Sequence, residues 1–182
     1  MSERPLSVRL RQLPNALTLL RFAAIPLFVV LLVNESDGPS WPAGIVFGLA
    51  AVTDQLDGYL ARLWKVESAF GKVADPLADR LMIDVCVVML VAYDRLPWIA
   101  IAILARDAIL LAGYRYVVPR GYDFAVSQLG KAATWGLYAS LGFVLVTEKH
   151  TTWPLVCFWI SLGLAIAAAA QYVAKARREV TR

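Results

Sequence analysis

Histidine and cysteine are scarce in this sequence of 182 residues, which contains one histidine and two cysteines. Cys86 and Cys157 each lie inside an apolar run, and neither has the spacing or the neighbours of a metal site. We predict that both are packing residues. His150 lies in a short connection without a catalytic partner and is expected to be exposed and without a function. The scarcity of these ligands argues against a zinc site.

Several common binding motifs are missing as well. No basic stripe interleaved with aromatic residues is present, which argues against a nucleic-acid partner although the net charge is +4. Gly71-Lys72 and Gly130-Lys131 lack the upstream glycine and the following Ser or Thr of a P-loop, so no ATP site is expected. No small-residue cleavage pattern follows the first apolar run, which is therefore expected to be a membrane span and not a signal peptide.

Apolar residues, in contrast, are abundant. They make up 59% of the sequence, and the mean hydropathy is +0.61, well above that of an ordinary soluble domain. The charged residues concentrate between apolar runs of about 20 residues, the length that crosses a bilayer core of about 30 Å. The sequence predicts an all-α fold, a polytopic membrane protein with six transmembrane helices. The expected helices cover residues 14–33, 42–62, 73–93, 97–118, 127–147 and 153–173.

Proline marks the expected helix starts, because a proline in the first turn costs no hydrogen bond. The four prolines that we place in first turns are Pro14, Pro42, Pro97 and Pro154. We divide the chain into a basic amphipathic segment over 1–13, the six-helix domain over 14–174 and a basic cytoplasmic tail over 175–182. Arginines alternate with apolar residues in the first segment, which favours a short juxtamembrane helix on an anionic surface. A disordered basic tail is the alternative.

Lysine and arginine indicate the orientation, because cytoplasmic connections carry an excess of both. Of the 18 such residues, twelve lie in the tails and connections on one side of the expected membrane domain. Only Arg95 and Lys149 lie on the other side, so we expect both termini in the cytoplasm. The remaining four fall inside expected helices and are Arg21, Arg80, Arg106 and Lys131. Charges inside a span cost free energy and usually mark a functional cavity, although we interpret Arg80 as a residue that pairs structurally or reaches towards the membrane surface.

Four aspartates stand out among the charges inside expected helices. Asp54 and Asp57 are spaced i and i+3 late in one helix, and Asp75 and Asp79 are spaced i and i+4 early in the next, so each pair shares a helix face. Both pairs come to a similar depth near the cytoplasmic side. Four clustered carboxylates repel one another unless cations neutralise them or some are protonated. All-oxygen ligands suit Mg²⁺, Mn²⁺ or Ca²⁺, and two such ions can clamp a pyrophosphate during phosphoryl transfer.

These aspartates belong to a longer string. Residues 54–79 read D-Q-L-D-G-Y-L-A-R, then eight residues, then G-K-V-A-D-P-L-A-D. At every fixed position the string matches D-x2-D-G-x2-A-R-x8-G-x3-D-x3-D, the signature of the CDP-alcohol phosphotransferase family, which the sequence therefore resembles. The resemblance extends to the six expected helices and to the opening Pro14-Asn15 with Leu17, Thr18 and Arg21.

The resemblance implies a membrane enzyme that transfers the phosphatidyl group of CDP-diacylglycerol to an alcohol and releases CMP. Asp54, Asp57 and Asp75 would be metal ligands. Asp79 would complete the metal site and act as the base that deprotonates the acceptor hydroxyl. The cofactors would be two divalent cations, Mg²⁺ or Mn²⁺.

The resemblance also implies a CDP pocket and a location. The small and basic residues that would line the pocket are Gly58, Ala61, Arg62 and Gly71. Members of the family are commonly homodimers, and this enzyme would lie in the cytoplasmic membrane of a bacterium with its active site near the cytoplasmic face. Its partners would be CDP-diacylglycerol, the acceptor alcohol and the surrounding membrane lipids.

The acceptor is expected to be bound mainly by the later helices. The candidate acceptor-binding residues are Arg106, Asp107, Arg115, Lys131 and Arg21. Phosphatidylglycerophosphate synthases, which use glycerol 3-phosphate, resemble this chain in the pattern Pro-Asn-x-Leu-Thr-x-x-Arg and in a later Gly-Lys. They usually have Arg-Glu where this chain has Arg106-Asp107, and an Arg-Asp pair there resembles the cardiolipin synthases that use phosphatidylglycerol. Both acceptors stay open.

Two further alternatives fit the sequence less well. Family members that use an inositol phosphate acceptor usually lack the run D-P-L-A-D found at residues 75–79. A cation-coupled transporter would explain carboxylates inside a membrane. It would give no reason for Gly58, Ala61, Arg62 and Gly71 at their fixed gaps.

Overall fold

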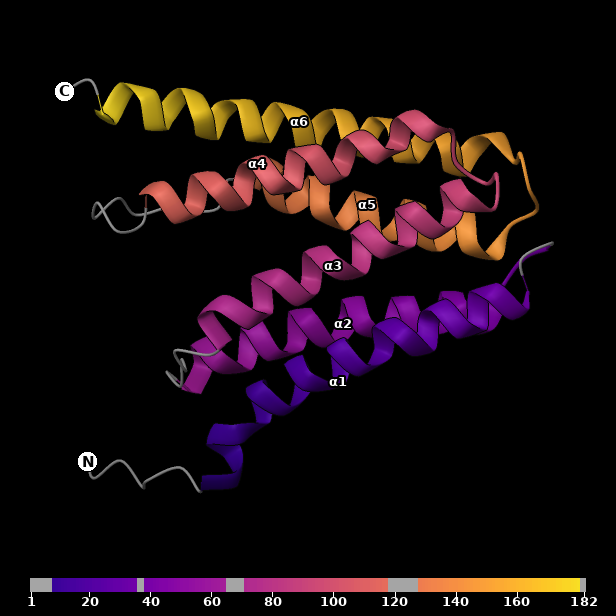
Figure 1. Ribbon diagram of the computed structural model, residues 1–182. Coiled ribbons are helices and arrows are strands. Elements are labelled where there is room, and N and C mark those ends of the chain that lie inside the picture. Colours follow the sequence, from indigo (N-terminus) through magenta and orange to yellow (C-terminus); the bar gives the residue numbers. More distant parts are fainter. Residues whose placement is uncertain (1–7, 36–37, 65–70, 118–127, 181–182) are drawn as a thin grey trace.

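The computed structural model describes residues 8–35, 38–64, 71–117 and 128–180. Side chains are described for residues 16–17, 19–35, 38–53, 80–109, 128–171 and 174. The described residues form helices and no strands, which confirms the predicted all-α class (Figure 1). The helices are α1 (Val8–Asn34), α2 (Trp41–Trp64), α3 (Gly71–Ala92), the 3-10 helix η1 (Trp98–Ile101), α4 (Ala102–Val117), α5 (Gln128–Val146) and α6 (Thr152–Val180).

The helix ends differ from the predicted ones at the two ends of the chain and at Pro97. Pro97 precedes the 3-10 helix η1 in an extended conformation and does not lie in the first turn of an α-helix, because α4 begins only at Ala102. α1 begins at Val8, so residues 8–13 continue into the first long helix and Pro14 lies in its second turn, not its first. α6 continues to Val180, seven residues beyond the predicted end at 173. Pro42 and Pro154 do lie in the first turns of α2 and α6, as predicted.

The helices pack in two pairs with α3 between them. α1 packs along α2, and α5 packs along α6, while α3 contacts α1 and α2 on one side and α4 and α5 on the other. Figure 1 shows the start of α1 and the end of α6 at the same end of the bundle. The connections α1–α2, α3–η1 and α5–α6 lie at the opposite end. This arrangement follows from an even number of helices that run alternately up and down.

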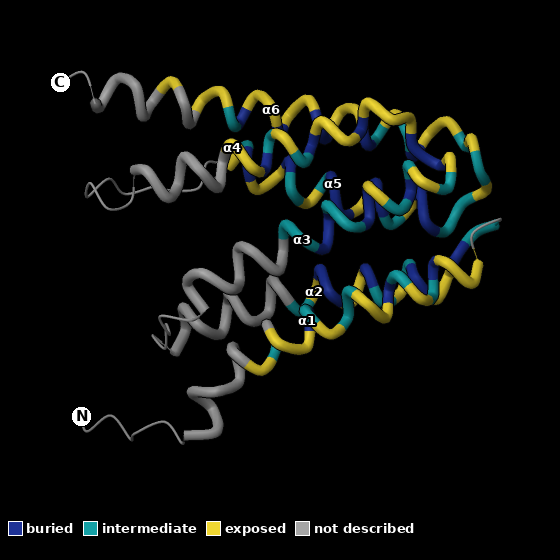
Figure 2. Tube along the Cα trace, in the orientation of Figure 1, coloured by how far each residue is buried: buried dark blue, intermediate teal, exposed yellow. Residues whose placement is uncertain are grey.

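Among the side chains that the structure describes, the buried ones lie between the helices (Figure 2). Phe28 on α1, Phe47 on α2 and Tyr138 on α5 form a row of rings whose neighbouring centroids are 5.9 and 5.3 Å apart. Tilted aromatic pairs at such distances add about 0.5–1.5 kcal/mol each beyond their buried area. Cys86 is fully buried in the same core, in agreement with its predicted packing role.

The outward faces carry large apolar side chains. Leu27 on α1, Ile45 on α2 and Ile160 on α6 are each more than half exposed. Two described helical segments are long and apolar enough to cross a membrane, Gln128–Val146 and Thr152–Gln171. Shorter apolar stretches are present at Leu19–Asn34 and Trp41–Thr53. An apolar exterior of this kind suits contact with lipid.

Arg95 joins the three connections at that end of the bundle. It is buried, and its Nη1 donates to the carbonyl oxygens of Gly38, at 3.0 Å, and Leu145, at 3.4 Å, while its Nη2 donates to that of Thr147. Gly38 precedes α2, and Leu145 and Thr147 lie at the end of α5, where helix carbonyls lack partners within the helix. Burial lowers the pKa of the Arg95 side chain, and the nearby Glu148 opposes this effect.

The close contact between α5 and α6 depends on Gly136. A methyl group there would lie 3.1 Å from the Cβ of Ser161 and would collide with its Oγ, which donates a hydrogen bond of 2.8 Å to the Cys157 carbonyl. Gly142, on the same helix, has no atom within 4 Å of the corresponding point. Both substitutions to alanine gain about 1 kcal/mol of helix propensity, and only Gly136→Ala adds an overpacking cost of about 1–3 kcal/mol.

We therefore expect Gly136→Ala to be less stable than Gly142→Ala by about 1–3 kcal/mol, since the propensity gain is common to both and cancels. Thermal unfolding of the two purified variants in the same detergent measures the difference. Equal unfolding temperatures would show that Ser161 moves aside without cost.

Candidate active site

The signature residues lie on two helices in contact with each other. Asp54, Asp57, Gly58, Ala61 and Arg62 occupy the second half of α2, and Gly71, Asp75 and Asp79 occupy the first half of α3. The predicted spacings therefore fall on helical backbone in both cases. The side chains of these eight residues lie outside the described residues, so their assignment to metal and CDP stays a prediction.

The donor chemistry of this chain fits a divalent cation at those positions. Four aspartates on adjacent helices supply only oxygen ligands, the ligands that Mg²⁺ and Mn²⁺ prefer. Among the side chains that the structure describes, no three His, Cys, Asp or Glu residues converge as a metal site. The four aspartates of the signature thus remain the candidate ligands.

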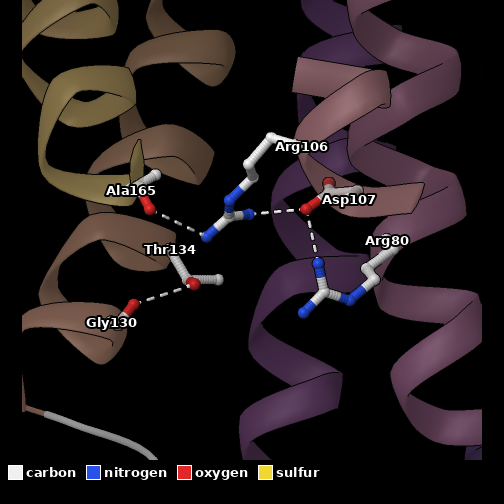
Figure 3. A network of polar contacts seen from close by, with 6 residues as sticks. All are labelled: Arg80, Arg106, Asp107, Gly130, Thr134 and Ala165. Atoms are coloured by element: carbon white, nitrogen blue, oxygen red, sulfur yellow. Dashed lines mark hydrogen bonds and ion pairs between the residues drawn. The ribbon is translucent and has the colours of Figure 1, made fainter. Parts of the chain in front are cut away.

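Next to the signature lies a network centred on Asp107 (Figure 3). Arg80 follows Asp79 on α3, and its Nη1 donates a short charged hydrogen bond to Oδ1 of Asp107 on α4. Nη1 of Arg106 donates to the same oxygen at 2.6 Å. Nη2 of Arg106 reaches the Ala165 carbonyl of α6 at 3.5 Å. One carboxylate oxygen therefore connects α3 with α4, and through Arg106 with α6.

The members of this network differ in their exposure. The Asp107 side chain is 5% exposed, whereas those of Arg106 and Arg80 are 15% and 32% exposed. The carboxyl group of Asp84, one turn after Arg80, lies close to that of Asp107. Oδ1 of Asp84 is buried and accepts no hydrogen bond from any described residue. The carboxylate at the centre is thus closed off from its surroundings, and the two guanidinium groups remain partly accessible.

The other predicted acceptor-binding residues are more dispersed. Lys131 is exposed in the first turn of α5. Thr134, one turn later, donates a hydrogen bond of 3.0 Å to the Gly130 carbonyl. Thr134 lies on the side of Arg106 that faces away from Asp107 (Figure 3). Arg21 is 1% exposed within α1. Arg115 lies on α4 with its side chain outside the described residues. The structure therefore brings together Arg106 and Asp107.

Arg80 joins this network, although the predicted acceptor-binding residues do not include it. Its predicted structural pairing is confirmed by the contact with Asp107. Its position directly after Asp79 is the sequence signal that draws attention to it.

Comparison with known proteins identifies the family. The profile described as CDP-alcohol phosphatidyltransferase matches residues 11–170. The chain belongs to the CDP-alcohol phosphatidyltransferase family. The resemblance seen in the sequence is thereby confirmed, and with it an enzyme of phospholipid synthesis instead of a transporter. Members of this family are membrane-bound and use divalent metals.

Relatives with two kinds of name are similar to this chain. The CDP-diacylglycerol–glycerol-3-phosphate 3-phosphatidyltransferase of Bacillus subtilis is 30% identical over 184 residues, covering 90% of this chain and 94% of the relative. The enzyme of that name from Escherichia coli K12 is 29% identical over 177 residues, covering 92% and 96%. The CMP-forming cardiolipin synthase of Streptomyces coelicolor is 39% identical over 146 residues, covering 77% and 67%.

Proposed function

We propose that this phosphatidyltransferase transfers the phosphatidyl group of CDP-diacylglycerol to the hydroxyl group of a glycerol-containing acceptor and releases CMP. The observation that carries the proposal is the complete eight-position signature, which falls on helical positions of two contacting helices, α2 and α3. The names of the relatives agree with this reaction.

The chain's own residues have distinct tasks in the proposed reaction. Asp79 accepts the proton of the acceptor hydroxyl, whose oxygen forms a bond to the phosphorus of the phosphatidyl group. The bond from that phosphorus to the bridging oxygen breaks, and CMP leaves with the electron pair. Arg62 binds a phosphate oxygen of the CDP group. Asp54, Asp57, Asp75 and Asp79 would hold two divalent cations, which would neutralise the charge of the pyrophosphate.

We also propose six membrane spans, with both termini and the active site on the cytoplasmic side of a bacterial membrane. The apolar outward faces and the two segments of spanning length support membrane insertion. The excess of lysine and arginine in the tails and connections at the end that carries the start of α1 supports the orientation. A homodimer is proposed from the resemblance to the family alone.

Two acceptors remain in the proposal, glycerol 3-phosphate and phosphatidylglycerol. The relatives named for glycerol 3-phosphate align over nearly their whole length. The relative named as a cardiolipin synthase has a higher sequence identity than these two, over a shorter stretch. Each acceptor has a glycerol hydroxyl group as nucleophile and a phosphate group that basic side chains can bind.

An acceptor screen tests the proposal. Purified protein in detergent with CDP-diacylglycerol and Mg²⁺ or Mn²⁺ is given glycerol 3-phosphate, phosphatidylglycerol, inositol phosphate or serine, and released CMP and the lipid product are measured. We expect CMP release with one of the first two acceptors and none without an acceptor. Absence of CMP with all four acceptors would contradict the proposed reaction.

A further inference from the structure

The buried carboxylate of Asp107 holds two arginines from different helices. We infer that Asp107 is a positioning residue that keeps Arg80 and Arg106 together as a pair of donors for the phosphate group of the acceptor, so that Arg80 belongs to the acceptor site. This inference rests on the proposed function. It differs from the sequence-based assignment, in which Asp107 itself binds the acceptor and Arg80 has only a structural role.

Direct binding of the acceptor by Asp107 is disfavoured by its surroundings. Its side chain is 5% exposed, and its Oδ1 already accepts hydrogen bonds from both guanidinium groups. A negative carboxylate would also repel the phosphate group that either candidate acceptor carries. The contacts that Asp107 does make are with Arg80 and Arg106, and any effect on the acceptor passes through them.

Within the part of the chain that the structure describes, the two arginines use only some of their N–H donors. A guanidinium group has five N–H donors in a planar fork that matches the oxygens of a phosphate group. Arg80 uses Nη1 for Asp107, and Arg106 uses Nη1 for Asp107 and makes a long Nη2 contact of 3.5 Å to Ala165. Nε of Arg106 has no hydrogen-bond partner among the described residues. The two guanidinium charges outnumber the single Asp107 carboxylate that they share, and the neighbouring carboxyl group of Asp84 offsets part of this positive excess.

The position of Arg80 in the chain places this phosphate-binding site next to the proposed base. Arg80 follows Asp79, the proposed base, and is therefore offset from it by about 1.5 Å along the axis of α3. A phosphate group bound by Arg80 is thus held near the level of Asp79 along the helix axis, while the two side chains leave α3 in directions about 100° apart. Arg106 fixes the other side of the phosphate group from α4. Orientation of the acceptor relative to the base is the expected result.

A double-mutant cycle on the acceptor KM tests the inference. Each of Asp107→Asn and Arg80→Ala is expected to raise the acceptor KM about 10- to 100-fold, the effect of losing a charged hydrogen bond. The KM for CDP-diacylglycerol should change by less than about twofold, since the CDP pocket lies elsewhere on α2 and α3. The double variant should fall short of the product of the single effects by about fivefold or more, because Asp107 acts through Arg80.

Conservative variants and a matched control sharpen the test. Asp107→Glu and Arg80→Lys retain the charge and should recover part of the acceptor affinity. Asp94→Asn removes an exposed carboxylate in the α3–η1 connection, outside this network, and should leave the acceptor KM within about twofold. Inorganic phosphate, added as a competitor of the acceptor, should inhibit Arg80→Ala more weakly than the unchanged protein.

The outcomes separate this inference from the proposed function. Suppose that the unchanged protein turns over and that the effects of Arg80→Ala and Asp107→Asn on the acceptor KM multiply in the double variant. This result would overturn the positioning role of Asp107 and leave the proposed reaction intact. An unchanged acceptor KM in Arg80→Lys and Arg80→Ala would remove Arg80 from the site even if Asp107→Asn fails to fold. Absence of turnover by the unchanged protein with either acceptor would contradict the reaction itself.

Discussion

Removal of divalent cations with a chelator is expected to abolish CMP release, and addition of Mg²⁺ or Mn²⁺ is expected to restore it. The four aspartates of the signature bring carboxylates to two contacting helices, where they repel one another and the pyrophosphate of the substrate if nothing neutralises them. Charge neutralisation by metals amounts to several kcal/mol in a transition state, so the loss should be on the order of 10³-fold or more.

CMP release with and without chelator measures this effect directly. Asp54→Asn and Asp57→Asn should each raise the Mg²⁺ concentration needed for half-maximal activity. Asp94→Asn is the matched control, because Asp94 is exposed in the α3–η1 connection with a φ of 55°, a conformation that asparagine also tolerates. Full activity in excess chelator would contradict the metal assignment.

Asp79→Asn is expected to lower turnover by about 10²- to 10⁴-fold, the usual contribution of a general base. Asparagine has nearly the same shape as aspartate but accepts no proton from the acceptor hydroxyl. Binding of CDP-diacylglycerol should be largely retained, since Asp54, Asp57 and Asp75 remain as ligands. The measurements are kcat with the best acceptor and equilibrium binding of CDP-diacylglycerol.

The same Asp94→Asn variant serves as the control for that substitution. Its kcat should equal that of the unchanged protein. Turnover of Asp79→Asn at the unchanged rate would refute the role of Asp79 as the base. A loss of CDP-diacylglycerol binding as large as the loss of turnover would assign Asp79 to metal binding alone.

The sequence predicted the number and order of the long helices because apolar runs and connections alternate plainly. The predicted bounds were wrong at the start of the first helix and at the end of the last helix, where hydropathy and helix propensity change at different residues. Hydropathy sets the length of an apolar run, but helix propensity sets where the helix stops. Residues 167–180 are rich in alanine and charged residues with good helix propensity and contain no glycine or proline, so α6 continues to Val180.

The start of α1 shows the same kind of error, because this helix also extends beyond its predicted bounds. The sequence predicts Pro14 as a first-turn residue, since proline is most common there. A proline inside a helix removes one hydrogen bond and its ring pushes against the carbonyl of residue i−4, which bends the helix without always ending it. The leucines and arginines over residues 8–13 favour helix. Residues 8–13 of the basic segment and the first long helix are consequently one element.

The site was predictable only where it is local in sequence. Asp54 and Asp57, or Asp75 and Asp79, are within one helix turn of each other, and helical geometry alone predicts that each pair shares a face. Arg80 and Asp107 are 27 residues apart on different helices. Their contact depends on how α3 and α4 pack, which no spacing in a single sequence encodes.

The Arg95 contacts have a consequence for how the molecule opens. A single side chain fastens the turn before α2 to the end of α5, and it does so from the connection between α3 and η1. Opening of the α3–η1 connection removes the guanidinium from the other two connections, so the three are coupled through one side chain. We therefore expect the amide hydrogens of these three connections to exchange together.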